Sequence, residues 1–332
     1  MSDNSVISTR VRLARNLKDF PFPCKLSPDG MEKVIEKVRS AGKNSNSSIA
    51  SDFKFIKMSD LTEAQCVSLV ERRIVSPEFI SNTEGRALLV NSDESLSIMI
   101  NEEDHIRIQA ITKGLALEQT YDLVDKLDTL LDESLDFAFS EKLGYLTQCP
   151  TNLGTGMRAS VMLHLPALEK SRAIGRIAGN LSKLGLTIRG THGEGTEPKG
   201  SLYQLSNQVT LGISEKAAIE NLKNITSQLI SQEELARERI CSNIDIQDSI
   251  SRSLGILKYA RTIAHDEALQ LLSNVRLGIV SGQLKDVPLL TIDKLMTDVE
   301  PATLMVNSGK NLSAAQRDVA RADLLRKALE EV

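Results

Sequence analysis

Short strand-like runs alternate with longer helical stretches as far as Leu211, and this alternation limits the possible folds more than any other feature. The strand-like runs are brief and apolar: Phe53–Met58, Ala87–Val90, Leu96–Ile100, Val161–Leu165, Thr187–Arg189 and Tyr203–Leu211. Helical periodicity marks the segments Met31–Arg39, Leu115–Leu135 and Ser171–Leu184. Because each strand and helix must bury an apolar face, the pattern predicts an α+β fold with a sheet backed by helices.

Beyond Ser214 the pattern changes to almost continuous helical periodicity. The periodic segments are Glu215–Cys241, Ile246–Ala260, Asp266–Leu277 and Ala314–Glu331, with Pro288 and Pro301 as interruptions. We therefore predict two domains, a sheet-containing domain over residues 1–240 and a smaller, mainly helical domain over residues 241–332. A chain of 332 residues is long enough for both domains to bury a core without a disulfide or a metal ion.

Composition excludes several classes of protein. The net charge is −4, so the chain has no overall basic footprint for nucleic acid. Its four cysteines stand far apart and without paired histidines, which argues against a zinc site and a disulfide framework and favours a reducing compartment. No apolar run reaches the roughly 18 residues that a membrane span needs. We expect a cytoplasmic protein without a direct nucleic-acid or membrane partner.

A compact loop that ends at Arg158 combines a lone cysteine, small residues and an arginine. The small residues Gly154, Thr155 and Gly156 would let backbone N–H groups approach a bound oxyanion, and Arg158 would neutralise its charge. Cys149 beside them would be drawn toward its thiolate form. The loop therefore predicts an anion-handling active site, and a turn that merely bounds a strand is the alternative.

Three further segments carry charged side chains in short loops or extended runs. Asn101–Arg107 follows the strand-like run Leu96–Ile100, and Arg189–Glu197 and Ser8–Arg12 each contain arginines. In their order along the chain, these segments and the cysteine loop resemble the four motifs of the ATP:guanido phosphotransferases, the phosphagen kinases. Long, ordered motifs of this kind are far more specific than a single short glycine pattern.

The resemblance extends over nearly the whole chain and is strongest to the bacterial protein-arginine kinases within that family. The stretches that carry it are Ser8–Asn16, Leu202–Gly212 and Arg317–Ala322. It implies a curved antiparallel sheet flanked by helices, with the active site in its concave face, followed by the helical C-terminal domain.

A guanidinium is a poor nucleophile because its charge is delocalised, so its phosphorylation requires carboxylates that grip the planar group and accept a proton. The resemblance implies Glu103 as the catalytic base and Glu194 as its partner carboxylate. Glu102 is the next candidate, although at a strand end its side chain should face away from that of Glu103. Cys149 is implied to stabilise the substrate cation. Solvated carboxylates and an inert buried thiol are the alternatives.

Phosphoryl transfer needs positive charge around the transferred group, which arginines and Mg²⁺ supply. By resemblance, ATP is bound by Ser8, Thr9, Arg10, Val11, Arg12, Arg73, Arg107, Arg158, Ala159, Ser160, Val161, Met162, Arg189, Gly190, Thr191, His192, Gly193 and Glu194. An extended segment would point Arg10 and Arg12 to one face. No protein ligand for Mg²⁺ is expected, since nucleotide oxygens and water would hold the ion. Arg73 departs from the family pattern, which has a nucleotide-contacting histidine there, but an arginine can also stack on a base or contact a phosphate.

A second charged motif lies near the C-terminus. Arg317 and Arg321 are four residues apart, so a helix would place them on one face with Asp318 adjacent. Arginines suit a phosphoryl group and a carboxylate suits a guanidinium, the two ends of phosphoarginine. By resemblance Arg317, Asp318, Arg321 and Ala322 form a phosphoarginine-binding motif, and a solvated charged helix face is the alternative.

These features together predict a protein-arginine kinase that uses Mg-ATP. Family members that act on small guanidines carry a helical N-terminal domain over the substrate, whereas this chain starts at its nucleotide motif, so we expect an uncovered site that admits a polypeptide. The resemblance also implies marking of proteins for a ClpC-type protease, phosphorylation of a stress repressor, a small cysteine-rich activator and a homodimer. A kinase for free arginine and a phosphoarginine-binding adaptor with little catalysis are the alternatives.

Overall fold

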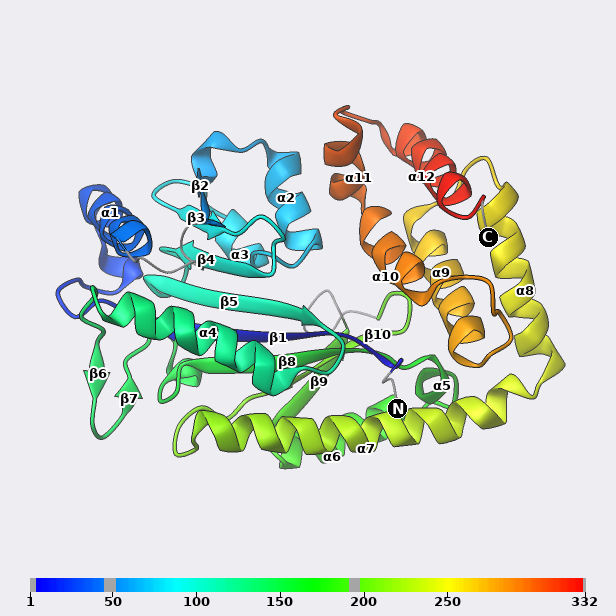
Figure 1. Cartoon of the computed structure of the whole chain (residues 1–332), viewed down its shortest axis with the longest axis horizontal. Coiled ribbons are helices and arrows are strands. Elements are labelled where there is room, and N and C mark those ends of the chain that lie inside the picture. Colours follow the sequence, from blue (N-terminus) through cyan, green and yellow to red (C-terminus); the bar gives the residue numbers. More distant parts are fainter. Residues whose placement is uncertain (1–3, 45–51, 191–197, 331–332) are drawn as a thin grey trace.

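Figure 1 shows the computed structural model, which describes residues 4–44, 52–190 and 198–330. Within these ranges, eight strands form one antiparallel sheet in the order β2-β3-β4-β5-β1-β8-β10-β9. Their bounds are β1 Val6–Arg15, β2 Lys54–Lys57, β3 Ala87–Val90, β4 Leu96–Ile100, β5 Ile106–Lys113, β8 Met157–His164, β9 Leu186–Gly190 and β10 Leu202–Asn207. A separate hairpin pairs β6 (Phe139–Ser140) with β7 (Gly144–Tyr145).

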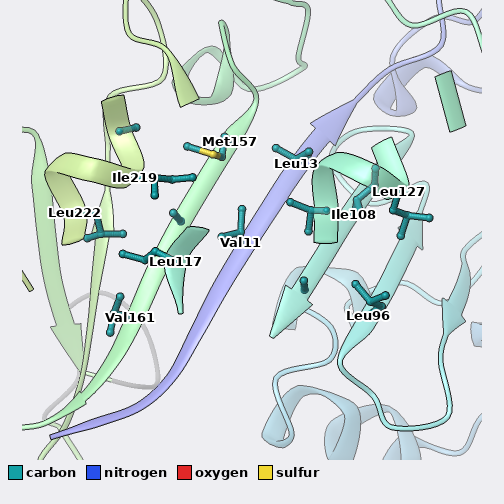
Figure 2. Close-up of a cluster of buried hydrophobic side chains, with 14 of the residues drawn as sticks. Val11, Leu13, Leu96, Ile108, Leu117, Leu127, Met157, Val161, Ile219 and Leu222 are labelled. Carbon is teal, nitrogen blue, oxygen red and sulfur yellow. The ribbon is translucent and has the colours of Figure 1, made fainter. Parts of the chain in front are cut away.

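Two long helices, α4 (Leu117–Asp132) and α7 (Glu215–Cys241), cover one face of the central strands. Figure 2 shows the apolar side chains of the sheet and these helices in one cluster, which includes Val11, Leu13, Ile108, Leu117, Leu127, Met157, Val161, Ile219 and Leu222. Because successive strand residues alternate between faces, burial of Val11 against the helices sends Arg10 and Arg12 to the opposite face.

Two shorter helices, α2 (Glu63–Glu71) and α3 (Pro77–Ile80), pack against the outer strands β3 and β4 through a separate cluster of apolar side chains. The side chains of Phe79, Leu88 and Met99 are fully buried in it. The remaining helices of this part of the chain are α1 Pro28–Asn44, α5 Pro166–Lys170 and α6 Ile174–Lys183.

The C-terminal part is helical and has its own apolar cluster, which contains Leu257, Leu272, Val275, Ile292 and Leu325. Its helices are α8 Ile244–Tyr259, α9 His265–Val280, α10 Leu289–Asp298, α11 Pro301–Ser308 and α12 Ala314–Ala328. The two prolines do interrupt the helical pattern, since Pro288 precedes α10 as its N-cap and Pro301 opens α11.

The C-terminal helices contact the sheet-containing part at several places. At the end of β8, His164 Nε2 lies 2.8 Å from Ser273 Oγ of α9. At the start of α11, the Glu71 carboxylate of α2 accepts the backbone N–H groups of Ala302 at 2.9 Å and Thr303 at 2.6 Å. Figure 1 shows α2 and α11 beside each other above the sheet. The helices α9 to α11 are therefore held close to the sheet face that Arg10 and Arg12 occupy.

The predicted α+β class, with an antiparallel sheet flanked by helices and a mainly helical C-terminal part, is confirmed. The division at residue 240 stays a prediction. None of the described helices is long and apolar enough to cross a membrane.

Candidate active site

A cavity of about 800 Å³ opens on the sheet face opposite α4 and α7. The lining residues come from strands β1, β8 and β10, from residues 70–73 and 75–78 at and after the end of α2, and from helices α9 and α10. Sheet-containing and C-terminal parts of the chain therefore share one cavity.

Four arginines, which we call the arginine cluster, line this cavity: Arg10 and Arg12 of β1, Arg107 of β5 and Arg158 of β8. Burial, and then the positive charges of Arg107 and Arg158, lower the pKa of Arg12 to about 9. Burial and neighbouring arginines also hold the pKa of Arg10 well below its usual range. Crowded like charges of this kind favour a bound polyanion, because an anion relieves both their repulsion and their loss of hydration.

Hydrogen bonding inside the protein satisfies only part of this cluster. Arg10 donates to Gln204 Oε1 of β10 at 2.7 Å. The buried Nε of Arg158, in contrast, has no hydrogen-bond partner among the described residues. Burial, with the charges of Arg189 and Arg107, lowers the pKa of Arg158. The cluster thus retains donor capacity for an anion.

Arg107 joins the arginine cluster to two carboxylates on the connection between β4 and β5. Its guanidinium lies 2.6 Å from Glu102 Oε2 and 3.2 Å from Glu103 Oε2. The Glu102 side chain is only 1% exposed and also accepts from the Ser76 hydroxyl, whereas the Glu103 side chain is 38% exposed. Glu103 can therefore meet a substrate, while Glu102 fixes Arg107.

The expectation that Glu102 and Glu103 face opposite ways is wrong, since both contact Arg107. The reason is local backbone geometry. Residues 101–105 form a bend between β4 and β5 instead of extended strand, and Asn101 has a positive φ of 63°. Side chains on such a bend do not follow strand alternation.

The cysteine loop lies beside Glu103. Cys149 precedes a short 3₁₀ turn, Pro150–Asn152, and its Sγ is 3.1 Å from Thr151 Oγ1. The amide of Asn152 donates to Glu103 Oε2 at 3.4 Å. The negative charge of an ionised Cys149 raises the pKa of Arg158, so the thiol and the arginine cluster share one electrostatic environment.

The two glycines of this loop serve backbone geometry, and the prediction that their N–H groups admit an oxyanion is wrong. Gly154 and Gly156 have φ values of 110° and 62°. A Cβ on Gly154 would lie 2.2 Å from Thr210 O. The N–H groups of Gly154, Thr155 and Gly156 already donate to backbone carbonyls. The buried Nε of Arg158, by contrast, has no hydrogen-bond partner among the described residues.

Asp104 is a functional candidate that sequence reasoning misses. It is fully buried, and its Oδ1 accepts from Asn16 Nδ2 at 2.7 Å and from the Gln148 N–H at 2.8 Å. Burial raises its pKa despite these bonds. Because Asp104 follows Glu103 and Gln148 precedes Cys149, this carboxylate ties the two proposed reactive residues together. The only signal for it in the sequence is its position as an acidic residue directly after Glu103.

Strand alternation divides the nucleotide-binding residues predicted on β1 and β8 into two groups. Thr9, Val11, Ala159 and Val161 are fully buried on the helix-covered side, where Thr9 Oγ1 donates to Gly114 O at 2.7 Å. Their side chains do not line the cavity. The prediction that consecutive residues of β1 and β8 all bind the nucleotide therefore includes too many residues. The alternating positions, including Arg10, Arg12, Arg158 and Met162, do line it, and Ser8 and Ser160 lie at the same parity.

Arg73 and Arg189 add to the positive lining of the cavity, as do Arg72 and Lys199. Arg73, just after α2, donates to the Ser8 hydroxyl, and burial lowers its pKa to about 10. Arg189 donates through Nε to Thr187 Oγ1 at 3.2 Å, and Gly190 also lines the cavity. The predicted residues Thr191, His192, Gly193 and Glu194 lie outside the described residues.

The C-terminal motif lies on α12, away from this cavity. Arg321 is 1% exposed and donates to Val299 O and Ile263 O, each at 2.9 Å, and to Asp318 Oδ1 at 2.7 Å. Ala322 is buried as well, whereas Asp318 is 38% exposed. Arg321 therefore supports the fold of the motif, and Arg317 and Asp318 are its more exposed charged members.

No group of three or more His, Cys, Asp or Glu side chains in the described part of the chain is arranged to hold a metal ion. The arginine cluster fits a different group, the phosphates of a nucleotide, because buried guanidinium donors suit phosphate oxygens.

Two family models match the chain. The model described as ATP:guanido phosphotransferase, C-terminal catalytic domain, matches residues 33–236, and the model described as Protein-arginine kinase McsB C-terminal domain matches residues 243–332. The solved structure of the substrate-free duplicated taurocyamine kinase from Schistosoma mansoni is similar, with a TM-score of 0.60 and 32% identity over 69% of this chain and 33% of that one. Lombricine kinase has a TM-score of 0.62 and 25% identity over 70% of this chain and 67% of its own.

Curated relatives match over almost the full length. The protein-arginine kinase of Halothermothrix orenii is 47% identical over 323 residues, which cover 97% of this chain and 92% of that protein. That of Clostridium acetobutylicum is 44% identical over 332 residues, which cover 99% and 97%. The chain therefore belongs to the ATP:guanido phosphotransferase family, in the group of the protein-arginine kinases.

Proposed function

We propose that this chain transfers the γ-phosphoryl group of ATP to arginine side chains of proteins. The observation that carries the proposal is the contact between Glu103 and Arg107, in which a half-exposed carboxylate borders a partly buried arginine cluster. The names of the curated relatives, protein-arginine kinases, support the choice of acceptor.

In this proposal the arginine cluster binds the phosphates of ATP. Arg12 and Arg158 would face the transferred group from neighbouring strands, and their buried donors would stabilise the charge that develops on its oxygens. Mg²⁺ bound to phosphate oxygens and water would add further positive charge. Because the cluster is already assembled, little reorganisation is needed when the nucleotide binds.

Glu103 would hold the substrate guanidinium bidentately and aim one nitrogen at the γ-phosphorus. As the N–P bond forms, the bond between phosphorus and the leaving oxygen of ADP breaks, and Glu103 takes the proton from nitrogen. Glu194 is proposed as the second carboxylate and Cys149 as an electrostatic partner of the guanidinium. Glu102 would act through Arg107 and is a positioning residue.

A second binding function is proposed for α12. Arg317 and the half-exposed Asp318 would contact the phosphoryl group and the guanidinium of a phosphoarginine side chain. Arg321 and Ala322 are both buried and would support this site from the interior of the protein.

The cellular setting is proposed from the family resemblance. It comprises Mg-ATP as co-substrate, the cytoplasm, a homodimer, a small cysteine-rich activator, a stress repressor as one target, and delivery of phosphorylated proteins to a ClpC-type unfoldase.

The deciding experiment supplies ATP with an unfolded protein in one reaction and with free arginine in another. The product to measure is acid-labile phosphate, because a P–N bond is lost in acid whereas phosphate esters survive. We expect label on the unfolded protein. Label on free arginine alone would favour the small-guanidine kinase. If neither acceptor is labelled but the protein still binds phosphoarginine peptides, the adaptor is favoured.

A further inference from the structure

The cavity has a charged end at the central strands. Arg12 and Arg158 form a register pair there, with Glu103 close by through Arg107. Two residues farther along β1, Arg10 donates to Gln204. These side chains suit the phosphates and the reacting groups, since guanidinium donors match phosphate oxygens.

The opposite end of the cavity carries apolar side chains of the sheet and of the C-terminal helices among polar residues such as Asp293 and Thr297. Met162 lies four residues beyond Arg158 on β8 and pairs with Ser8 and Gln204 on the neighbouring strands. At the usual rise of about 3.3 Å per residue, four residues span roughly 13 Å. An extended nucleoside triphosphate can bridge this distance, with its phosphates at Arg158 and its base near Met162.

Helices α9 and α10 supply the apolar wall that faces this end of the sheet. Leu269 of α9 and Met296 of α10 line the same cavity as Met162 and Leu202. Leu202, at the start of β10, also packs against the C-terminal apolar cluster. Next to it, a Cβ placed on Gly200 would lie 3.1 Å from Leu269 O and 3.3 Å from Met296 Cε. The two parts of the chain meet closely here.

A buried polar network fixes this wall to the sheet. His164, at the end of β8, contacts Ser273 Oγ at 2.8 Å through Nε2 and Arg276 at 3.2 Å through Nδ1. Arg276 Nε in turn donates to Asp293 Oδ1 of α10 at 2.7 Å, and Asp293 lines the cavity. Burial and the charge of Arg276 hold the pKa of His164 well below its usual range, so Nδ1 can accept from Arg276. The position of the wall is therefore defined before any ligand binds.

We propose that the purine base of the nucleotide lies between Met162 and Leu202 of the sheet and Leu269 and Met296 of the C-terminal helices. The C-terminal helices thereby become part of the nucleotide site. The inference rests on the proposed function in taking ATP as the phosphoryl donor. A flat, apolar base gains from burial between such side chains, and the guanidinium of Arg73 nearby can stack on it.

The first test uses the intact protein and 8-azido-ATP as the probe, with ultraviolet light and peptide mapping. We expect label on peptides from α9 or α10 as well as on β8, and competition by unlabelled ATP. The proposal would be overturned if the label that unlabelled ATP prevents were found only on the strands of the sheet, with α9 and α10 unlabelled. This readout needs no variant, so failure of a variant to fold does not affect it.

The second test compares Leu269→Ala and Met296→Ala with Leu272→Ala and Leu295→Ala. The two control leucines are buried on the same helices but do not line the cavity. Calorimetry would measure the dissociation constants of ADP and of inorganic tripolyphosphate, which lacks the base. We expect the lining variants to weaken ADP binding by about three- to tenfold and to leave tripolyphosphate binding unchanged, since only base contacts are lost. Unchanged ADP affinity, or equal losses for both ligands, would overturn the proposal.

These outcomes are separate from those that test the function itself. If wild-type protein places no acid-labile phosphate on protein arginine, the proposed function fails, yet crosslinking still locates the base. If arginine is phosphorylated but α9 and α10 stay unlabelled, the function stands and the base site is elsewhere.

Discussion

Arg12 of β1 and Arg158 of β8 occupy paired positions in the antiparallel sheet, and both line the cavity. The charge of Arg158 adds to burial and to the charge of Arg107 in lowering the pKa of Arg12. This pairing destabilises the ligand-free chain and favours the state in which an anion lies between the two guanidinium groups. The strands thus hold a binding site in place at the expense of local electrostatic repulsion.

The first prediction concerns this pair. Arg12→Met keeps much of the side-chain volume and removes one buried charge, so the free energy of unfolding without ligand should stay equal or rise. ATP affinity should fall by about ten- to a hundredfold, because a charge-assisted contact to the transferred phosphoryl group is lost. Urea unfolding and calorimetry measure the two quantities. Arg252→Met, on an exposed α8 side chain paired with Asp248, is the control and should change neither. A clear loss of ligand-free stability in Arg12→Met would contradict the argument.

The second prediction concerns the base. Glu103→Gln should reduce phosphoryl transfer by at least about a hundredfold, since the amide keeps the shape but accepts no proton. Nucleotide affinity should change little, because the arginine cluster is intact. Glu141→Gln, at an exposed position on the β6–β7 turn, is the matched control. Near-normal turnover in a folded Glu103→Gln protein would remove Glu103 from the mechanism.

Sequence patterns predict the fold well where local signals are strong. Ala87–Val90 and Leu96–Ile100 are strands with the predicted bounds, because each is an apolar run between turn residues. The helix Glu215–Cys241 also has the predicted bounds. The strand β1 is harder to predict, since its alternate residues Arg10 and Arg12 are charged. Only the cavity explains why these charges are partly buried there.

The shared cavity could not be predicted in the same way. Leu269 and Met296 look like ordinary apolar positions of amphipathic helices, and nothing local indicates which apolar side chains border a cavity. The bond between Asp104 and the Gln148 N–H joins residues 44 positions apart. Such contacts depend on the tertiary arrangement of strands, which a single sequence does not specify.

The third prediction concerns Cys149. A thiol-directed reagent should label it more slowly once ATP and a protein substrate are bound, because its loop contacts Glu103 through Asn152 and lines the cavity through Thr151 and Asn152. Cys149→Ser should also lose much activity. Cys241 is the internal control, since burial raises its pKa and it lies at the end of α7, apart from the cysteine loop. Peptide mapping by mass spectrometry gives both rates. Ligand-independent labelling of Cys149 would make it a structural residue.

The fourth prediction concerns pH and stability. His105 accepts from the Leu17 N–H at 3.0 Å through Nδ1 and lies 2.9 Å from Pro21 O through Nε2, and burial lowers its pKa from 6.5 to about 4. Between these values the unfolded chain binds a proton that the folded chain does not, so this histidine makes stability fall as pH drops from 6.5 to 4.

The size of that effect is about 1.4 kcal/mol per pH unit. In His105→Gln the pH slope of the unfolding free energy should lose this contribution, whatever the variant's absolute stability. Glu233, whose pKa burial raises to about 7, makes stability rise as pH drops, but it does so equally in the variant and in wild type. The difference between the two slopes therefore isolates the contribution of His105. Urea titrations between pH 4.5 and 7 measure the slope, with His265→Gln as the control. Identical slopes in His105→Gln and wild type would refute the assignment.

The last prediction separates the two arginines of the C-terminal motif. Arg321→Ala should destabilise the chain by about 3–5 kcal/mol, because it leaves the carbonyls of Val299 and Ile263 and the carboxylate of Asp318 without their buried donor. Arg317→Ala removes one bond, to Leu312 O at 3.0 Å, so it should cost less than about 1 kcal/mol. Binding of a phosphoarginine peptide should nevertheless fall about ten- to a hundredfold in Arg317→Ala, since this guanidinium is the one left for the phosphoryl group. Unfolding curves and calorimetric titration test the two halves independently. Equal peptide affinity in wild type and Arg317→Ala would mean that α12 presents only a solvated charged face. If Arg321→Ala is stable but no longer binds the peptide, Arg321 contacts the ligand.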